Sequence, residues 1–289
     1  MVLDFCIPSP LQRLLDPEIA GFGVEIWVKR DDLIHPQISG NKWRKLKYNI
    51  EIAKKEGYTK ILTFGGAFSN HIYATAAAGQ ILGLHTIGII RGERVEPLNS
   101  TLAFAESVGM ELHFIDRETY RQKNSQDQLG SYQKSFSPVY IIPEGGANSS
   151  GVKGCEEIVG EIQIPFNYIC CACGTGTTLS GIINSLSPFQ KAIGFPVLKG
   201  GEFLHDEIVK QLKCPKISNF HLETDYHFGG YAKWNAELES FMERFEKVNL
   251  FRLEPVYTGK LFYGLYDLIK KGYFPKGSRI VAVHTGGLR

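Results

Sequence analysis

The sequence of 289 residues contains no long uninterrupted apolar segment and no excess of charge of one sign. No stretch approaches the roughly 18 apolar residues of a membrane-spanning helix, and residues 1–6 (MVLDFC) are not a basic segment followed by an apolar run. We therefore expect a cytoplasmic protein without a membrane partner. Lys and Arg number 32 against 30 Asp and Glu, which gives no reason to expect nucleic acid as a partner. A small neutral or zwitterionic ligand fits this composition better.

The six cysteines are not spaced as metal ligands. Three of them, Cys170, Cys171 and Cys173, lie within an apolar run typical of a strand. Zinc sites need paired cysteine or histidine ligands on loops that can converge on one ion. Free buried cysteine is a common small hydrophobic residue, so we expect no metal, and a chain of this length needs no disulfides to fold.

Strand-like runs alternate with helical patterns after the first 45 residues, without an internal repeat or a low-complexity segment. This alternation is typical of crossover units and parallel sheets. Helices are predicted over residues 42–55 and 70–78, and the polar residues 117–137 predict a surface helix and loop. Strands are predicted at residues 60–64, 86–90, 111–115, 139–142, 168–173, 192–197, 220–223 and 279–284. So many strands would make an unusual single sheet, which favours two α/β domains.

The first chemical signal is Lys42, which residues 39–42 (SGNK) place at the start of a helix. A cation is disfavoured at the positive end of a helix dipole, so the neutral amine becomes more accessible for imine formation. The alternative is an ordinary solvated charge beside Arg44, Lys45 and Lys47, and composition alone favours that alternative.

A second signal is the glycine turn within residues 64–71 (FGGAFSNH), which leads from a strand into a helix. Ser69 and Asn70 are natural N-caps, so capping alone is one interpretation. The turn also presents backbone N–H groups and polar side chains at the carboxyl end of a parallel strand, where open α/β sheets bind ligands. A substrate carboxylate would suit this position.

Residues 173–178 (CGTGTT) form a third turn, again after a buried strand and before an apolar helix. Several backbone N–H groups and three hydroxyls meet there, as a phosphate dianion requires. The dinucleotide fingerprint is absent because Leu179 replaces its third glycine, and the Gly-Lys-Ser/Thr end of a P-loop is also missing. A lone phosphate monoester fits better, with a tight turn that binds nothing as the alternative. An amine for imine formation, a phosphate site and a carboxylate site together match a pyridoxal 5′-phosphate (PLP) enzyme that acts on an amino acid.

Five separated blocks strengthen this interpretation: residues 29–32 (KRDD), 40–46 (GNKWRKL), 65–70 (GGAFSN), 255–260 (PVYTGK) and 284–287 (HTGG). In this order they resemble the 1-aminocyclopropane-1-carboxylate (ACC) deaminase and D-cysteine desulfhydrase family, nearly end to end. The resemblance implies the tryptophan synthase β-like fold (fold type II). That is an α/β fold of two domains with open, mostly parallel twisted sheets flanked by helices, PLP in the cleft between them, and commonly a homodimer. We expect residues 1–45 and 151–289 to form the large PLP-binding domain and residues 46–150 the small α/β domain.

The same resemblance implies roles for individual residues. Lys42 is the Schiff-base lysine, and Asn70 is the partner of the phenolic oxygen of the cofactor. The phosphate loop corresponds to Gly174, Thr175, Gly176, Thr177 and Thr178. Substrate binding is expected from Ser69, Asn70, His71 and Tyr257. The expected catalytic residues are Lys42, Ser69 and Tyr257, whereas Lys45 supports the site.

Two positions favour the desulfhydrase branch, and both are expected to bind the cofactor. Where ACC deaminases have a glutamate facing the pyridine nitrogen, this sequence has Thr258, whose neutral hydroxyl cannot stabilise a protonated ring comparably. Weaker electron withdrawal suffices when sulfide leaves from Cβ. Thr285 also matches the desulfhydrases, since the deaminases tend to carry leucine there. Against this, Phe228 stands where both branches usually have tyrosine, and Tyr226 or Tyr231 is left as a substitute.

The sequence thus predicts a PLP-dependent lyase or deaminase that converts D-cysteine to pyruvate, sulfide and ammonia by α,β-elimination, with the released Lys42 as base. The first alternative is deamination of ACC to 2-oxobutyrate and ammonia, which Lys42, Ser69 and Tyr257 would also suit. The second is a protein that only binds PLP or another phosphorylated metabolite, which would not need those three residues together. A dehydrogenase is less favoured because the third glycine is missing.

Overall fold

The computed structural model describes residues 5–214 and 219–288. The chain divides into unit 1, residues 1–41 and 155–289, and unit 2, residues 42–154. It passes from one unit to the other inside α2 (Asn41–Lys55) and again inside α7 (Ser149–Gly160). Within the described residues, none of the helices has both the length and the apolar character needed to cross a membrane.

Unit 1 contains a sheet in which every neighbouring pair of strands is parallel except the pair at the β1 edge. The strand order is β1 (Leu11–Leu14), β2 (Glu25–Lys29), β10 (Arg279–Val283), β7 (Tyr168–Cys173), β8 (Lys191–Pro196) and β9 (Phe220–Leu222). The predicted α/β fold with mostly parallel sheets is confirmed. Because β7 and β10 are parallel neighbours, the turns that follow them lie at the same edge of the sheet.

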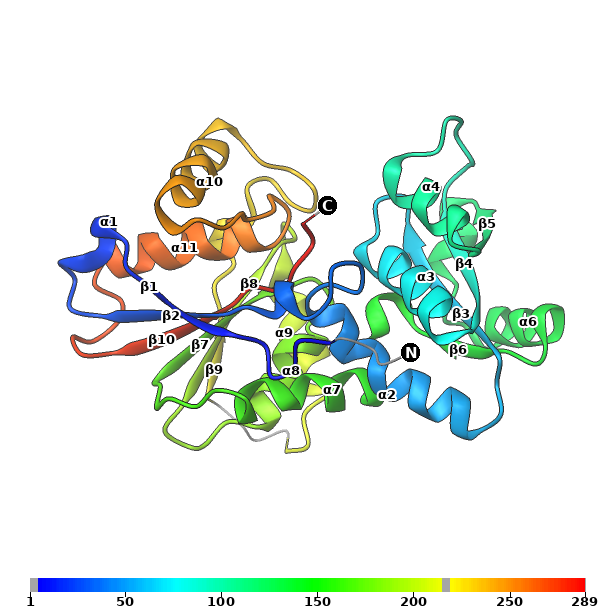
Figure 1. Ribbon diagram of the computed structural model, residues 1–289, viewed down its shortest axis with the longest axis horizontal. Helices are drawn as coiled ribbons and strands as arrows, with labels where there is room; N and C mark the ends of the chain where they lie inside the picture. Colours follow the sequence, from blue (N-terminus) through cyan, green and yellow to red (C-terminus); the bar gives the residue numbers. More distant parts are fainter. Residues whose placement is uncertain (1–4, 215–218, 289) are drawn as a thin grey trace. The chain divides into compact units, whose positions relative to one another are not determined.

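Helices cover both faces of this sheet (Figure 1). α10 (Ala236–Asn249) and α11 (Thr258–Lys270) pack on the face that carries Cys170 and Ala172. α8 (Thr177–Asn184) and α9 (Leu204–Val209) pack on the opposite face, which carries Cys171 and Cys173. Successive strand residues point to opposite faces, so the cysteine run fills two separate apolar cores with small side chains. The short helix α1 (Pro17–Ala20) lies between β1 and β2.

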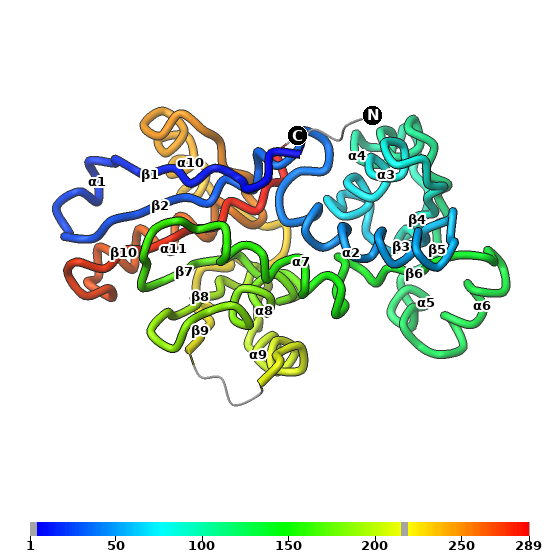
Figure 2. Tube along the Cα trace, turned by 60° about the horizontal axis from the view of Figure 1, so that its bottom comes forward, coloured from blue at the N-terminus to red at the C-terminus, as the bar shows by residue number. Residues whose placement is uncertain are grey.

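Unit 2 contains a fully parallel sheet, in the order β5 (Glu111–Ile115), β4 (His85–Arg91), β3 (Lys60–Gly66) and β6 (Tyr140–Ile142). α3 (Asn70–Leu82) and α4 (Ser100–Ser107) cover one face, and α5 (Arg117–Arg121) and α6 (Gln126–Phe136) the other (Figure 2). The predicted surface helix and loop at residues 117–137 therefore consists of two helices. Short 3-10 helices lie at Asp31–Leu33, Glu144–Gly146, Gly201–Phe203 and Asp225–His227.

The eight strands that the sequence predicts all occur, as β3 to β10. The two predicted helices occur as α2 and α3, and α3 ends at Gly83, which adopts a left-handed conformation with a φ of 68°. β1 and β2 are the strands that the sequence analysis missed, and both lie in the first 45 residues. The alternation of strand and helix therefore locates β3 to β10 but neither β2, which is a parallel neighbour of β10, nor the antiparallel edge strand β1.

Candidate functional site

The turn between β7 and α8 leaves the first turn of the helix without a side-chain cap. Its N-cap residue Gly176 has a φ of 76°, and a Cβ at this position would lie 2.7 Å from Cγ1 of Ile208. Glycine is required here for both backbone conformation and space. Because the first N–H groups of a helix have no partner inside it, α8 begins with donors that can bind an anion.

Hydroxyl groups add to this anion site. Thr177 and Thr178 are buried, and Oγ1 of Thr175 lies 3.1 Å from Oγ1 of Thr177. Nδ2 of Asn41 donates a hydrogen bond to Oγ1 of Thr178 at 2.9 Å, which leaves the proton of that hydroxyl to be donated elsewhere. Asn41 is a site residue that the sequence analysis missed. The sequence gives only a weak signal for this role, namely the position of Asn41 directly before Lys42. Its partner Thr178 is 137 residues away in the chain.

The turn after β10 brings Thr285 to the same place. Asn41 also donates its backbone N–H to the carbonyl oxygen of Thr285 at 3.3 Å. A Cβ on Gly40 would lie 1.8 Å from that oxygen, so only glycine, here with a φ of 68°, lets the two chain segments pack so closely. The structure thus joins Thr285 and the predicted phosphate loop through Asn41.

Tyr257 lies against the start of the same loop. A Cβ on Gly174 would be 3.2 Å from Cε1 of Tyr257 and 3.3 Å from its hydroxyl oxygen. The next residue, Thr258, is fully buried, and its Oγ1 accepts a hydrogen bond from the backbone N–H of Glu254 at 2.9 Å. Tyr257, Thr258 and the predicted phosphate loop are therefore arranged within one unit.

The carboxylate of Glu254 stabilises the start of α11. Its two oxygens accept hydrogen bonds from the backbone N–H groups of Val256, Tyr257 and Thr258, at 2.9, 2.6 and 2.7 Å. A carboxylate at a helix N-terminus satisfies donors that have no partner in the helix and compensates its dipole. The carboxylate of Glu254 is therefore held by backbone donors. The side chain at position 258, by contrast, is neutral.

The segment around Phe228 shows which tyrosine lies near Tyr257. Phe228 has a φ of 52° and packs edge-on against Tyr263, with ring centroids 4.9 Å apart. The hydroxyl of Tyr226 donates to Oδ2 of Asp267 at 2.7 Å. Tyr231 instead lies edge-on to Tyr257, with centroids 6.1 Å apart, and it is 45% exposed. Of the two substitutes that the sequence analysis considered, Tyr231 is the one beside Tyr257.

In unit 2, the turn between β3 and α3 carries a side-chain cap. Oγ of Ser69 accepts hydrogen bonds from the backbone N–H groups of His71 and Ile72, at 3.2 and 3.3 Å. A Cβ on Gly65 would lie 2.7 Å from this Oγ, so glycine allows the turn to close over the helix start. Ser69 is thus a helix cap that still has a hydroxyl proton to donate. Asn70, the first residue of α3, is half-buried beside it.

Lys42 and His71 also belong to unit 2 and interact electrostatically. Lys42 is the second residue of α2 and is half-buried, whereas His71 is only 2% exposed. Burial, followed by the charges of Lys42 and Lys45, lowers the pKa of His71 to about 3. His71 is therefore a neutral imidazole at neutral pH.

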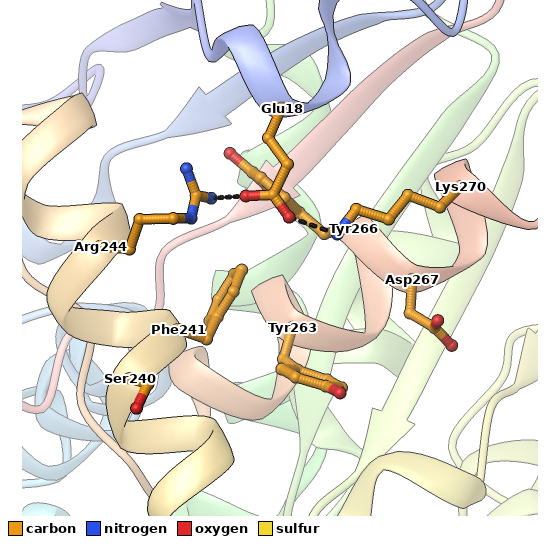
Figure 3. Close-up of a pocket in the computed structure, with 8 residues that line it drawn as sticks. All are labelled: Glu18, Ser240, Phe241, Arg244, Tyr263, Tyr266, Asp267 and Lys270. Carbon is orange, nitrogen blue, oxygen red and sulfur yellow. Dashed lines mark hydrogen bonds and ion pairs between the residues drawn. The ribbon is translucent and has the colours of Figure 1, made fainter.

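A separate hollow on unit 1 is lined by none of the site residues that the sequence predicts (Figure 3). Phe241, Tyr263 and Tyr266 form its aromatic part. Glu18 pairs with both of its cationic side chains, Arg244 and Lys270. Because these charges already neutralise one another, the hollow has no unpaired cation for a phosphate.

The hydrogen-bond donors and the amine of the described residues fit PLP, the expected cofactor. The uncapped start of α8 and its threonine hydroxyls suit a phosphate monoester, and Lys42 supplies a primary amine. In the part of the chain that the structure describes, no group of three His, Cys, Asp or Glu side chains is arranged to hold a metal ion.

Comparison with known proteins extends over both units. A family model described as "Pyridoxal-phosphate dependent enzyme" matches residues 2–286. A protein of Pyrococcus horikoshii, provisionally named 1-aminocyclopropane-1-carboxylate deaminase, is 32% identical over 97% of this chain and 89% of its own length. The "Bifunctional D-cysteine desulfhydrase/1-aminocyclopropane-1-carboxylate deaminase, mitochondrial" of Arabidopsis thaliana is 32% identical over 98% of this chain and 77% of its own. A solved structure described as an ACC deaminase homologue is 31% identical, with a TM-score of 0.81 over 97% of this chain and 89% of that one.

Proposed function

The chain belongs to the pyridoxal-phosphate dependent enzyme family, and from this premise we propose that it eliminates sulfide from D-cysteine and releases pyruvate and ammonia. The observation that carries this proposal is the buried, neutral hydroxyl of Thr258. With one water molecule consumed, D-cysteine yields pyruvate, hydrogen sulfide and ammonia, so the reaction needs no oxidant or reductant.

Position 258 bears on how strongly the cofactor is polarised. When bound, PLP withdraws electrons from Cα of the amino acid, and it does so most strongly with a protonated pyridine nitrogen. We assign Thr258 to face that nitrogen. A hydroxyl stabilises a positive charge much less than a carboxylate does, and the nearby Glu254 carboxylate is already bonded to three backbone N–H groups. Thr258 therefore suits a substrate with a good leaving group on Cβ better than it suits the opening of a cyclopropane ring.

The chemical step is assigned to side chains of unit 2. Nζ of Lys42 is the amine that would hold the cofactor through its aldehyde, and as a free amine it would remove the Cα proton of the substrate. The hydroxyl of Ser69 and the side chains of Asn70 and His71 would orient the substrate, and Asn70 would also contact the phenolic oxygen of the cofactor. The acceptor role of Ser69 in capping leaves its proton available for such a contact.

The binding step is assigned mainly to unit 1. The phosphate group would be held by Gly174, Thr175, Gly176, Thr177 and Thr178. Thr285 completes the proposed cofactor contacts. Tyr257, which lies against Gly174, would orient the substrate or relay a proton. A homodimer, implied by the resemblance, is part of this proposal and is checked by sedimentation equilibrium of the purified protein.

The proposal is tested by assaying purified protein with D-cysteine, L-cysteine and ACC, and by measuring pyruvate, sulfide and 2-oxobutyrate. We expect kcat/KM for D-cysteine to exceed that for ACC by at least about 100-fold, a difference of about 2.7 kcal/mol in transition-state stabilisation. Formation of 2-oxobutyrate from ACC with an equal or higher kcat/KM would contradict the assignment. Preferential turnover of L-cysteine would contradict the stereochemical part alone.

ACC deamination is the second candidate, and the provisional name of the Pyrococcus horikoshii relative favours it. Thr258→Glu separates the two candidates, because it introduces the carboxylate that ACC deaminases have at this position. Thr258→Gln is the matched control with the same size and no charge. If Thr258 limits electron withdrawal, Thr258→Glu raises the ACC to D-cysteine activity ratio and Thr258→Gln does not. Equal ratios in the two variants would remove the argument from position 258.

A further inference from the structure

Lys260 is a buried lysine that the proposed function does not use. It is the third residue of α11 and is only 1% exposed. Its Nζ donates hydrogen bonds to the carbonyl oxygens of Gly230, His227 and Val197, at 2.7, 2.8 and 3.5 Å. An ammonium group has three donors, so three carbonyls can satisfy it completely. Lysine is rarely buried to this extent unless it is paired, so this arrangement calls for an explanation.

The partners of Lys260 are neutral carbonyl oxygens rather than a carboxylate. Burial lowers the pKa of Lys260 to about 8, and the negative charge of Glu254 opposes this change, so the ammonium form predominates at neutral pH. Lys29, a second buried lysine of unit 1, is instead bonded to the carboxylate of Glu161 and the carbonyl oxygen of Ser9, both at 2.6 Å. Converging backbone carbonyls are ligands that proteins use for K⁺. The surroundings of Lys260 thus resemble a monovalent-cation site that a side chain occupies.

The turn from His227 to Gly230 has a strained backbone. Phe228, Gly229 and Gly230 have φ values of 52°, 91° and 116°. Three consecutive positive φ values, the first at a residue with a large side chain, persist only where the surroundings hold them. The backbone N–H of Gly230 closes the turn by donating to the carbonyl oxygen of His227 at 3.0 Å. Lys260 therefore binds both ends of this turn to α11.

The same amine connects the segments that carry two tyrosines. Tyr231 directly follows the turn, and Tyr257 is the N-cap residue of α11, three residues before Lys260. The two rings lie edge-on, with an interplanar angle of 74°. Val197 links this arrangement to the predicted phosphate loop, because its backbone N–H donates to the carbonyl oxygen of Cys173 at 3.0 Å. One ammonium group thus joins three segments of unit 1 beside the candidate site.

We propose that Lys260 is a positioning residue that acts as a built-in monovalent cation: its ammonium group binds the 227–230 turn to α11 and holds the ring of Tyr231 against Tyr257. The inference rests on the proposed role of Tyr257 in orienting the substrate. Without the ammonium group, buried carbonyls would face one another with no donor, and the turn would relax. Tyr231 would then separate from Tyr257, and the substrate would be oriented less well.

Two substitutions distinguish an empty cation site from a filled one. Lys260→Ala removes the amine and leaves space beside the carbonyls, whereas Lys260→Met fills most of that space with a group that donates no hydrogen bond. We expect kcat/KM of the holoenzyme for D-cysteine to fall about 10- to 100-fold in both variants. Ammonium chloride or potassium chloride should restore kcat/KM by about 10-fold in Lys260→Ala but not in Lys260→Met.

Tetramethylammonium chloride is the salt control, because this cation is larger and has no N–H donor, and it should restore neither variant. Lys29→Ala is the matched control for a buried lysine, since its partners Ser9 and Glu161 lie outside the elements that carry Tyr231 and Tyr257. Its kcat/KM should respond equally to all three salts. Wild-type activity of Lys260→Ala, or its failure to recover with ammonium and with potassium, would overturn the proposal. So would an equal recovery in Lys29→Ala.

Tyr231→Ala tests the route from Lys260 to the substrate in a variant that should fold normally, since Tyr231 is 45% exposed. We expect kcat/KM to fall about 10-fold, and Lys260→Met to add less than about 3-fold in the double variant, because both changes break the same contact. Additive losses would show that Lys260 acts elsewhere. An unchanged kcat/KM in Tyr231→Ala would overturn the proposal even if the Lys260 variants do not fold.

Urea unfolding tests the cation site without any substrate. Ammonium and potassium should raise the urea midpoint of Lys260→Ala above its value in tetramethylammonium at the same concentration, and should leave that of Lys260→Met unchanged. Absence of this stabilisation would refute the built-in cation. If the wild-type protein does not turn over D-cysteine, the proposed function fails instead, so the two failures are distinguishable.

Discussion

The turn from β7 into α8 and the turn from β3 into α3 both join the carboxyl end of a parallel strand to a helix. In the first, Gly176 is the N-cap and no side chain caps the helix. In the second, Ser69 accepts from two backbone N–H groups. An uncapped start offers its backbone donors to an anion, whereas a capped start has used donors internally and can offer only side chains. Two turns of the same construction thus suit different tasks, phosphate binding in unit 1 and side-chain chemistry in unit 2.

This difference implies that the two units respond differently to substitution. Around the β7–α8 turn, substitutions that change glycine conformation or close packing should have the largest effects, because backbone atoms make the proposed contacts with the anion there. Around α2 and the β3–α3 turn, loss of a functional group should matter most.

The largest effect is expected from Lys42→Ala. Turnover of D-cysteine should fall by at least about 1,000-fold, because both covalent attachment and the proposed base are lost. PLP should still bind without a covalent bond, since the phosphate contacts that we propose in unit 1 would remain. Turnover assays, borohydride reduction with mass spectrometry, and equilibrium dialysis of PLP measure these three properties. A variant that turns over normally would refute the assignment of Lys42, and one that no longer retains PLP would refute the division of tasks.

Gly176→Ala should weaken PLP binding by about 10- to 100-fold, because its φ of 76° strains an alanine and the added Cβ would lie 2.7 Å from Ile208. Gly83→Ala is the matched control. Gly83 also has a positive φ, of 68°, but nothing lies within 4 Å of a Cβ added there, and it is at the far end of α3 from the β3–α3 turn. Both variants should lose about 1 kcal/mol of unfolding free energy. Equal PLP affinities in the two would contradict a specific role for the β7–α8 turn.

Ser69→Ala tests the capped turn, with Ser125→Ala as its partner. Ser125 caps α6 in the same unit by accepting from the backbone N–H of Gln128. Each substitution should cost about 1 kcal/mol in urea unfolding. Only Ser69→Ala should also reduce kcat/KM, by about 10-fold, because the hydrogen bond that we propose from Ser69 to the substrate would be lost. A reduction of the same size in Ser125→Ala would mean that the effect comes from helix stability.

The part of the fold that could be predicted from the sequence depends on local patterns. The apolar stripe of α2 is visible within a single segment, and so are the eight strands of the alternating region. β2 was missed because it has no strong pattern of its own. Its sheet position is fixed by pairing with β10, in which Glu25 lies opposite Arg279. A contact between residues so far apart in the chain leaves no local signal.

The same limit applies to the candidate site. Glycines and threonines of the β7–α8 turn are adjacent in sequence, so a phosphate site could be proposed there from the sequence alone. The bond from Asn41 to Thr178 and the contact of Tyr231 with Tyr257 could not, because they depend on how distant segments meet. Nor could the sequence tell that the hydroxyl of Tyr226 is bonded to Asp267.

Two buried histidines extend the comparison of the units to pH. In unit 1, His284 donates from Nε2 to the carbonyl oxygen of Arg252, and its Nδ1 accepts from the backbone N–H of Gly286. Burial lowers the pKa of both His71 and His284. A second proton on His284 would be carried by Nδ1, which lies 3.5 Å from Oδ1 of Asp32, whereas a second proton on His71 would be repelled by the charges of Lys42 and Lys45. Acid should therefore destabilise the protein more strongly through His71 in unit 2 than through His284 in unit 1.

The last prediction is the acid sensitivity of the folded protein that follows from this difference. The pKa of His71 is about 3 in the folded protein and near 6.5 when unfolded, so the unfolded state binds more protons between these values. Stability is complete above about pH 6.5 and falls as the pH decreases toward 3, with up to about 1.4 kcal/mol per pH unit from this residue. Urea unfolding at pH 6.5 and at about pH 5 should show a shallower decline in His71→Gln than in wild-type protein. His284→Gln is the matched variant of unit 1 and should change the slope less, because Asp32 partly compensates the proton there. An equal or larger change in His284→Gln would show that the neighbouring charges do not distinguish the two histidines.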